Sequence, residues 1–357
     1  MRLRSRLHLP SGFTLVEVLL GIIILAIGLL GLAAVFPLVV KQQREAQDTV
    51  VGVASARGAE AIIAANVGLN SPLTTGGWAK LSWEMYKQAF NNKDSGRIPW
   101  KNVFQQLGTT NAIYDDAGVF RINSDQGQQN DVVIKPAERL FPAASSGASP
   151  LFVWDMAPAL ASPVTATALP ALPTFQPLRV TVFVRRVDPG IRVPANKTLA
   201  QLLIDGKDGT GQTVTPVATD ADGNATQNGL GVYSKFLTPT ITRAYKRYGA
   251  TGGAFTVIEF GNATDAELGA VRQVGQQLVD IDGNIYTVIA LPDEPDQEYT
   301  NNENTLRRSV VISPGLPTEF VSASSATATS SSTRWNDLQL LCTPQIPAAV
   351  TSFIVRR

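Results

Sequence analysis

An unbroken apolar segment, Phe13 to Val40, constrains this chain more than any other feature. It contains one charged side chain, Glu17, and it exceeds the about 20 apolar residues that an α-helix needs to cross a bilayer. An ordinary secretory signal has a shorter apolar region, about 7–15 residues, with a small-residue cleavage site after it. The segment therefore predicts a membrane-spanning helix with one carboxylate close to its start.

A short basic leader precedes this segment. Arg2, Arg4 and Arg6 give it the excess of positive charge found on the cytoplasmic side of membranes, so we expect the N-terminus to be cytoplasmic. A carboxylate in lipid is costly and asks for a functional reason. At the start of a helix Glu17 would meet the positive end of the macrodipole, and an α-ammonium of this or a neighbouring subunit could neutralise it. The plain alternative is a signal anchor with a stray acidic residue.

The residues around Gly12 carry a family resemblance. GFTLVEVLL resembles, at every position, the N-terminal signal of type IV prepilins and type II secretion pseudopilins, in which a glycine precedes Phe-Thr-Leu-(hydrophobic)-Glu. The resemblance implies that prepilin peptidase cleaves between Gly12 and Phe13, that Phe13 becomes N-methylated, and that Glu17 sets the register of filament subunits. It covers about residues 1–65, and the run LAIGLLGLAAV looks most like minor pilins of the PilV type.

The same resemblance implies a fold class, a location and partners. The implied fold is α+β, with a long N-terminal helical spine packed on an enlarged antiparallel β-sheet head. The implied location is the bacterial inner membrane, single-pass with a periplasmic head, and then a pilus or pseudopilus. The implied partners are prepilin peptidase, other pilins or pseudopilins, an inner-membrane assembly platform and membrane lipid.

A change of composition at Lys41 divides the spine into two halves. We expect one continuous helix from Phe13 to about Asn66, kinked or loosened near Pro37. Its outer half is expected to pack on the head through a helical face made of Ala46, Val50, Val53, Ala54, Ala61 and Ile62. The leader, the membrane half, the amphipathic half and the head are expected to cover residues 1–12, 13–40, 41–67 and 68–357.

The head is predicted to be rich in strands, because β-branched runs alternate with Gly, Pro, Asp and Asn. Trp78–Phe90 is expected to form a short amphipathic helix before them. Asp282-Gly283 between two apolar runs predicts a β-hairpin. The predicted strands are Gly118–Asn123, Asp131–Lys135, Leu151–Trp154, Leu178–Val187, Ala254–Phe260, Gln276–Ile281, Ile285–Leu291, Arg308–Ile312 and Thr351–Val355.

Low-complexity composition predicts loops or insertions near residues 142–173, 204–231 and 322–333. Within the second of these, Asp220, Asp222 and Asn224 resemble the opening of an oxygen-ligand calcium loop. However, Ala225 and Gly231 stand where an EF-hand requires Gly and Glu. This calcium candidate therefore competes with ordinary turn chemistry.

Charge balance and the scarcity of His and Cys narrow the function. The chain has 30 basic and 29 acidic side chains, so it carries no nucleic-acid footprint. Its one histidine, His8, lies in the leader, and a chain without the leader can run no Ser-His-Asp mechanism and build no His-containing zinc site. The one cysteine, Cys342, allows no intrachain disulfide and is expected to be buried. We therefore expect no enzyme activity and no cofactor.

Three functional classes remain open. The favoured one is a non-catalytic minor pilin or pseudopilin subunit. The second is a membrane-tethered periplasmic binding protein or adhesin. The third is a tethered hydrolase, which would need a cleft with two carboxylates about 5–10 Å apart. The sequence leaves open the choice between a type IV pilus and a type II secretion pseudopilus, and between a tip and a shaft position.

Overall fold

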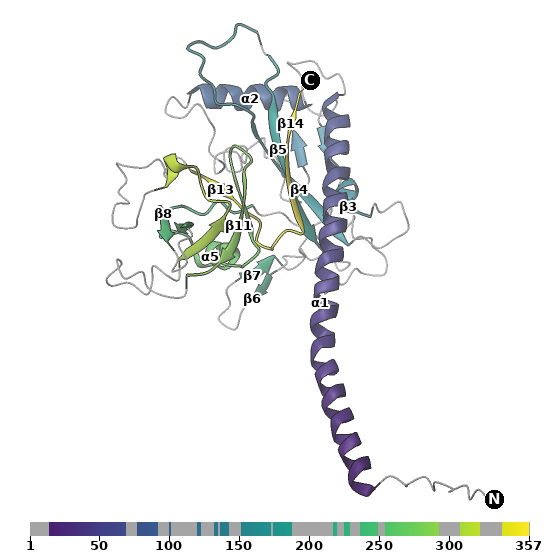
Figure 1. The fold of residues 1–357 in the computed structure, drawn as a ribbon. Coiled ribbons are helices and arrows are strands. Elements are labelled where there is room, and N and C mark those ends of the chain that lie inside the picture. Colours follow the sequence, from purple (N-terminus) through teal and green to yellow (C-terminus); the bar gives the residue numbers. More distant parts are fainter. Residues whose placement is uncertain are drawn as a thin grey trace, which may run out of the picture. The chain divides into compact units, whose positions relative to one another are not determined.

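A computed structural model shows a long N-terminal helix and a head of antiparallel sheets (Figure 1). The chain divides into two compact units, Met1–Val50 and Val51–Arg357. The residues that the structure describes are 14–68, 77–91, 100, 120–122, 132–134, 136–142, 151–172, 174–187, 217–219, 225–228, 236–248, 254–292, 308–321 and 338–356.

Helix α1, Leu15–Gly68, confirms the predicted continuous spine. It passes through Pro37 without a break in its helical assignment. The described large apolar side chains of its apolar half are exposed, from Leu15 at 81% to Val40 at 45%. A helix whose apolar residues are unburied on every side needs lipid or other protein around it.

The buried face of α1 differs from the predicted one. Of the predicted face, Ile62 packs half-buried against the core, whereas the others, Ala46, Val50, Val53, Ala54 and Ala61, are exposed. The residues that are buried against the head are Gly52, Ser55, Ala56, Ala59 and Ile63. Most of these are small. Side-chain size, rather than hydrophobicity, determines which face of α1 is buried, because small side chains let the helix backbone approach the sheet closely.

At Gly52 the approach is closest. A Cβ built on Gly52 would lie 3.0 Å from Cβ of Ala348 and 3.2 Å from the Ala348 carbonyl carbon and oxygen. Glycine is therefore favoured by space at this point of the helix, since any larger residue would push against Ala348.

Helix α2, Gly77–Asn91, confirms the predicted short amphipathic helix. Trp78, Leu81 and Met85 are buried on its inner face. Ala89, wholly buried, continues the same face one turn further. The helix thus contributes a second covering element to the core that α1 covers.

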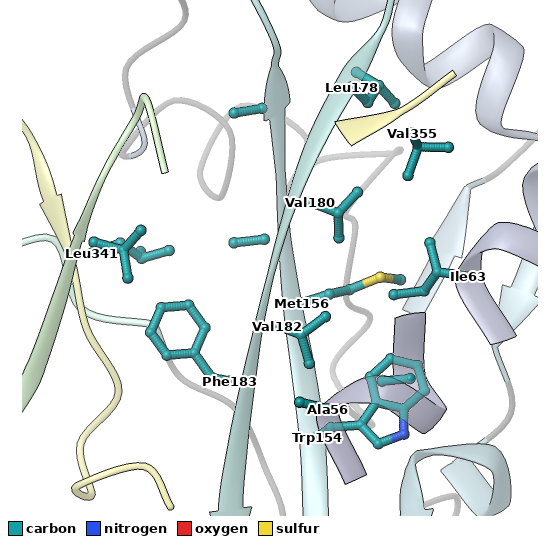
Figure 2. Packing of buried hydrophobic residues seen from close by; sticks show 14 of the residues in the cluster. Ala56, Ile63, Trp154, Met156, Leu178, Val180, Val182, Phe183, Leu341 and Val355 are labelled. Carbon is teal, nitrogen blue, oxygen red and sulfur yellow. The ribbon is translucent and has the colours of Figure 1, made fainter. Parts of the chain in front are cut away.

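A four-stranded antiparallel sheet in the order β14-β5-β4-β3 forms the centre of that core. The strands are β3 Leu140–Phe141, β4 Phe152–Leu160, β5 Leu178–Arg186 and β14 Ala349–Val355, and the 3₁₀ turn η2, Pro136–Arg139, leads into β3. Alternation along β4 and β5 places Trp154, Met156 and Val182 on the side of Ala56 and Ile63 of α1 (Figure 2).

The prediction of a loop near residues 142–173 is wrong for residues 152–160, which form strand β4. This strand is longer than the predicted strand Leu151–Trp154. All of its residues are buried, and it pairs with β5 from end to end. Pro158 is tolerated because β3 pairs only with Phe152 and Val153. Among the described strands, the outer edge of β4 beyond Val153 therefore has no ladder partner that needs an N–H.

A six-stranded antiparallel sheet has the order β13-β10-β11-β12-β9-β8. Its strands are β8 Arg243–Tyr248, β9 Ala254–Glu259, β10 Gln277–Asp280, β11 Ile285–Ala290, β12 Ser309–Ser313 and β13 Leu340–Leu341. Helix α5, Asp265–Val271, and the 3₁₀ turn η4, Thr318–Phe320, are further elements of this region, and β8, β13 and α5 were not predicted.

Strands β10 and β13 contribute to two hydrophobic cores. Val279 and Leu341 belong to the core of the four-stranded sheet, where Leu341 lies beside Phe183 (Figure 2). Their neighbours Leu278 and Leu340 belong to a second core with Cys342 and α5. Successive side chains of a strand point to opposite faces, so these strands connect the two cores.

Two short hairpins complete the described strands. β1 Phe120–Ile122 pairs with β2 Val132–Ile134, which confirms both predicted strands. β6 Val217–Thr219 pairs with β7 Ala225–Asn228 inside the segment 204–231 that was expected to be a loop. Backbone pairing there overrides a composition that disfavours strands. The expected loop at 322–333 lies outside the described residues.

Candidate functional site

The N-terminal end of α1 is the candidate functional site, and a capping box organises it. Oε2 of Glu17 accepts hydrogen bonds from the backbone N–H of Thr14 at 2.9 Å and from the Thr14 hydroxyl at 3.0 Å. The Thr14 hydroxyl oxygen in turn accepts from the Glu17 backbone N–H at 3.3 Å. Thr14 is thus the N-cap and Glu17 the third helical residue of a reciprocal cap.

This cap gives the carboxylate two roles. It satisfies backbone donors that the first turn of a helix leaves without partners, and it places negative charge at the positive end of the macrodipole. Oε1 of Glu17 takes no part in the cap. One carboxylate oxygen is therefore held by the helix itself, and the other is available to a group outside it.

The spacing Thr14-Leu-Val-Glu17 is the sequence signature of a capping box, followed by an apolar run. That signal was present in the sequence and was not used in the sequence prediction. The same spacing occurs at Thr264 and Glu267, where it caps α5 with the same three hydrogen bonds.

The other predicted site residues lie outside the described residues. Gly12 and Phe13, the expected cleavage point and methylation site, precede the described chain. Asp220, Asp222 and Asn224 of the calcium candidate lie between β6 and β7, in a segment that is outside the described residues. Within the described part of the chain, no group of three or more His, Cys, Asp or Glu side chains could hold a metal ion.

Beyond its cap, α1 is long and apolar enough to cross a membrane. Its most apolar stretch has a mean hydropathy of 3.0, and none of that stretch is buried. It is the single helix of this kind among the described residues. Exposed apolar side chains on this scale mark a surface that contacts lipid or other protein.

Comparison with known protein families finds a match at the N-terminal end of the chain. Residues 10–33 match a family model described as the prokaryotic N-terminal methylation motif. The chain carries the N-terminal signal of type IV pilins and pseudopilins. No curated protein and no solved structure matches the chain. With this signal, the long apolar helix and the antiparallel sheets make the fold α+β and pilin-like.

A second polar cluster lies inside the head and, unlike the exposed cap at Glu17, is fully buried. Asp155 of β4 accepts hydrogen bonds from Arg185 of β5 and Arg139 of η2, and all three side chains are at most 1% exposed. Arg139 Nε also donates to the Trp154 carbonyl at 3.0 Å, and the Trp154 indole N–H donates to the Glu138 carbonyl at 3.1 Å. A buried carboxylate held by two guanidinium groups joins structural elements and has no access to a substrate.

A third polar cluster closes the β10–β11 hairpin, whose position the Asp282-Gly283 pair predicted. Oδ2 of Asp280 accepts from the Tyr286 hydroxyl and from the Asn284 side-chain amide, each at 2.8 Å. Burial, followed by the charge of Asp280, raises the pKa of Tyr286 above its ordinary value. The Tyr286 hydroxyl therefore remains a proton donor in this cluster over the whole physiological range of pH.

Proposed function

We propose that this chain is the precursor of a minor pilin-like, non-catalytic subunit of a type IV pilus or a related type II secretion pseudopilus. Prepilin peptidase cleaves between Gly12 and Phe13, Phe13 becomes N-methylated, and the subunit enters a filament through the apolar half of α1. The observation that carries the proposal is the methylation motif at residues 10–33, together with the long helix α1, whose most apolar stretch is not buried.

Glu17 is the assembly residue in this proposal. After cleavage, the new α-ammonium of Phe13 would lie beside the capped first turn of α1. A filament core has a low dielectric, so an ammonium and a carboxylate from two subunits attract each other strongly once both have left water. Support comes from the cap, which fixes the carboxylate through Oε2 and leaves Oε1 to receive the ammonium of a neighbour.

The proposed topology follows from the charge of the leader. Arg2, Arg4 and Arg6 remain on the cytoplasmic side, residues 13–40 cross the bacterial inner membrane, and the head from about residue 68 is periplasmic. Residues 41–67 form the half of the spine that belongs to the head. The partners are prepilin peptidase, other pilins or pseudopilins, the inner-membrane assembly platform and membrane lipid, and PilV-type minor pilins are the proposed subgroup.

The test of this proposal is intact-mass spectrometry of the protein from its native membrane. The mature chain should begin at Phe13 and carry the extra mass of one methyl group. Gly12→Leu should leave the chain at full length, because the peptidase must approach the backbone closely at that bond. Gly21→Leu is the matched control, since a Cβ added at Gly21 meets no atom within 4 Å and the substitution lies away from the cleaved bond, so cleavage should stay intact. Residues 1–12 persisting in the wild-type protein would refute the proposal.

A second candidate is a membrane-tethered periplasmic binding protein or adhesin. It is favoured by the head, which holds a second hydrophobic core of its own beside the core that packs on α1. Cross-linking in the membrane separates the two candidates, because a filament subunit is recovered with other pilins and a tether is recovered alone.

A further inference from the structure

The loop that joins β4 to β5 is closed at its neck and fixed to α2. The backbone N–H of Ala161 donates to the Pro177 carbonyl at 3.0 Å, so the two arms start side by side. Ser82 of α2, wholly buried, donates to the Gln176 carbonyl at 2.8 Å and accepts from the Gln176 N–H at 2.6 Å. A surface loop whose ends are close and pinned is an Ω-type loop, a class that is frequently functional.

A cavity of about 220 Å³ lies between the two arms of this loop. Tyr86 of α2 lines it together with residues of both arms, and the described residues of the lining carry no charged side chain. The lining presents two kinds of chemistry. Ser162, Thr165 and Gln176 are the polar residues of the lining, and Pro163, Pro177 and the ring of Tyr86 belong to its apolar residues.

We propose that this cavity binds one ring of a neutral sugar. A lining without charge favours an uncharged ligand, because a charged ligand would lose its hydration with no opposite charge to replace it. A pyranose ring offers hydroxyl groups at its edge and C–H groups on its faces, which matches a lining that is half polar and half apolar. The volume is below the usual range of about 300–1,000 Å³ for drug-sized ligands, so it fits a single ring rather than an oligosaccharide.

The neck of the loop is preformed. The Ala161 bond and both bonds from Ser82 fix the base of each arm, so a ligand does not have to order that part of the loop when it binds. The cavity also lies at the Leu160–Leu178 end of the β4–β5 pair, whereas Gly52 of α1 meets Ala348 beside Val184 at the other end. Sugar binding and close helix packing therefore use opposite ends of one sheet.

The experiment is saturation-transfer NMR on the purified full-length chain in a detergent without sugar headgroups. The probes are glucose, galactose, mannose and N-acetylglucosamine, each at about 10 mM, since single-ring ligands bind in the millimolar range. At least one should show saturation transfer. Ala166→Trp, which fills the cavity, should abolish the signal, and Ala171→Trp, on an exposed part of the same loop outside the lining, should keep it.

A gentler variant guards against misfolding. Thr165→Val removes one lining hydroxyl at nearly constant shape and should weaken binding by about threefold to tenfold, the value of one neutral hydrogen bond. The proposal is overturned if none of the four sugars gives a signal, or if the signal survives Ala166→Trp in a variant whose circular dichroism is unchanged. It is equally overturned if a proline-containing peptide gives a signal that Ala166→Trp abolishes while the sugars give none, since the cavity would then be a protein contact. The readout does not depend on leader cleavage or filament assembly.

Discussion

Arg185 donates two hydrogen bonds to one oxygen of Asp155, from Nε at 2.8 Å and from Nη2 at 2.6 Å. The other oxygen of Asp155 accepts from Arg139. Thirty residues separate Asp155 from Arg185 along the chain, and the pair joins β4 to β5 inside the head. All three side chains are withdrawn from water, so the carboxylate is the group that makes the burial of two guanidinium groups tolerable.

Asp155→Asn should destabilise the head strongly. It keeps the shape of the side chain and removes its charge, which leaves two buried arginines without their shared anion, and the expected loss is about 3–5 kcal/mol in the free energy of unfolding. Urea denaturation of the full-length chain followed by circular dichroism measures it. Glu84→Gln is the control, because the Glu84–Lys87 pair at 2.6 Å is 39% and 38% exposed and its loss should cost less than about 1 kcal/mol. Equal midpoints for the two variants would contradict the prediction.

Gly52→Ala should destabilise the contact between α1 and Ala348, the residue before β14, although alanine is the better helix former. The new Cβ would stand 3.0 Å from Cβ of Ala348 and close to its backbone, and overpacking of this kind costs about 1–3 kcal/mol. Gly58→Ala is the matched control, since its Cβ would meet nothing within 4 Å, and it should stabilise the helix by about 0.5–1 kcal/mol. The measured quantity is the midpoint of thermal unfolding. Shifts of the same sign in both variants would show that helix propensity alone determines the effect of these substitutions on stability.

Gly283→Ala should weaken the β10–β11 hairpin for two reasons. Gly283 has a φ of 77°, and an added Cβ would lie 2.3 Å from Ser352 Oγ and 2.5 Å from Arg179 Cδ. Gly275→Ala separates the two causes, because Gly275 shares the positive φ of 93° but its nearest neighbour would be 4.0 Å away. The backbone strain is about 1–2 kcal/mol in both variants, and Gly283→Ala should lose more than that in urea denaturation. A loss no greater than that of Gly275→Ala would show that the hairpin tip has room to move.

Cys342 should make stability fall at alkaline pH. Burial, with a smaller contribution from Glu267, raises the pKa of its thiol. The folded state therefore keeps the proton when the unfolded state loses it, so the stabilising effect of the protonated thiol is complete below the unfolded pKa of about 8.5 and declines as the pH rises above it. Cys342→Ala should show a shallower decline between about pH 8 and pH 10 in urea denaturation. Rapid maleimide labelling of the native wild-type chain would contradict the burial on which this rests.

Glu17→Ala should impair assembly while leaving membrane insertion and leader cleavage intact. The substitution removes a carboxylate that is costly in lipid, together with the capping partner of Thr14. The loss should appear in cross-linking and co-purification with neighbouring pilins, which is the measurement to make. Thr14→Val serves as the companion variant, because it breaks the side-chain part of the cap but keeps the charge. Undiminished recovery of the partners with Glu17→Ala would leave the carboxylate without its proposed role.

Sequence patterns predicted those features whose cause is local. The spine helix, α2 and most of the longer strands follow from hydrophobic period and turn residues. The hairpin at Gly283 follows from a backbone angle that glycine adopts easily. The capping box at Thr14 and Glu17 was equally local and could have been predicted.

Features that depend on partners distant in sequence were not predictable. Strand β4 was partly assigned to a loop, because its Ala and Pro residues are typical of loops and only the pairing with β5 makes them a strand. The prediction of the buried face of α1 was largely wrong for a related reason. The residues that are buried there are mostly small and weakly hydrophobic, and they are favoured only because a sheet packs closely against them.

The sequence by itself therefore determined the N-terminal signal, the membrane-length helix and the α+β class, because each depends on residues within one or two helical turns or strand repeats. Tertiary structure alone decided which face of α1 is buried, how Arg139 and Arg185 share Asp155, and where the arms of the β4–β5 loop form an open cavity. These features arise from contacts between segments far apart in the chain, and the packing of the whole head selects among the many pairings that local patterns permit.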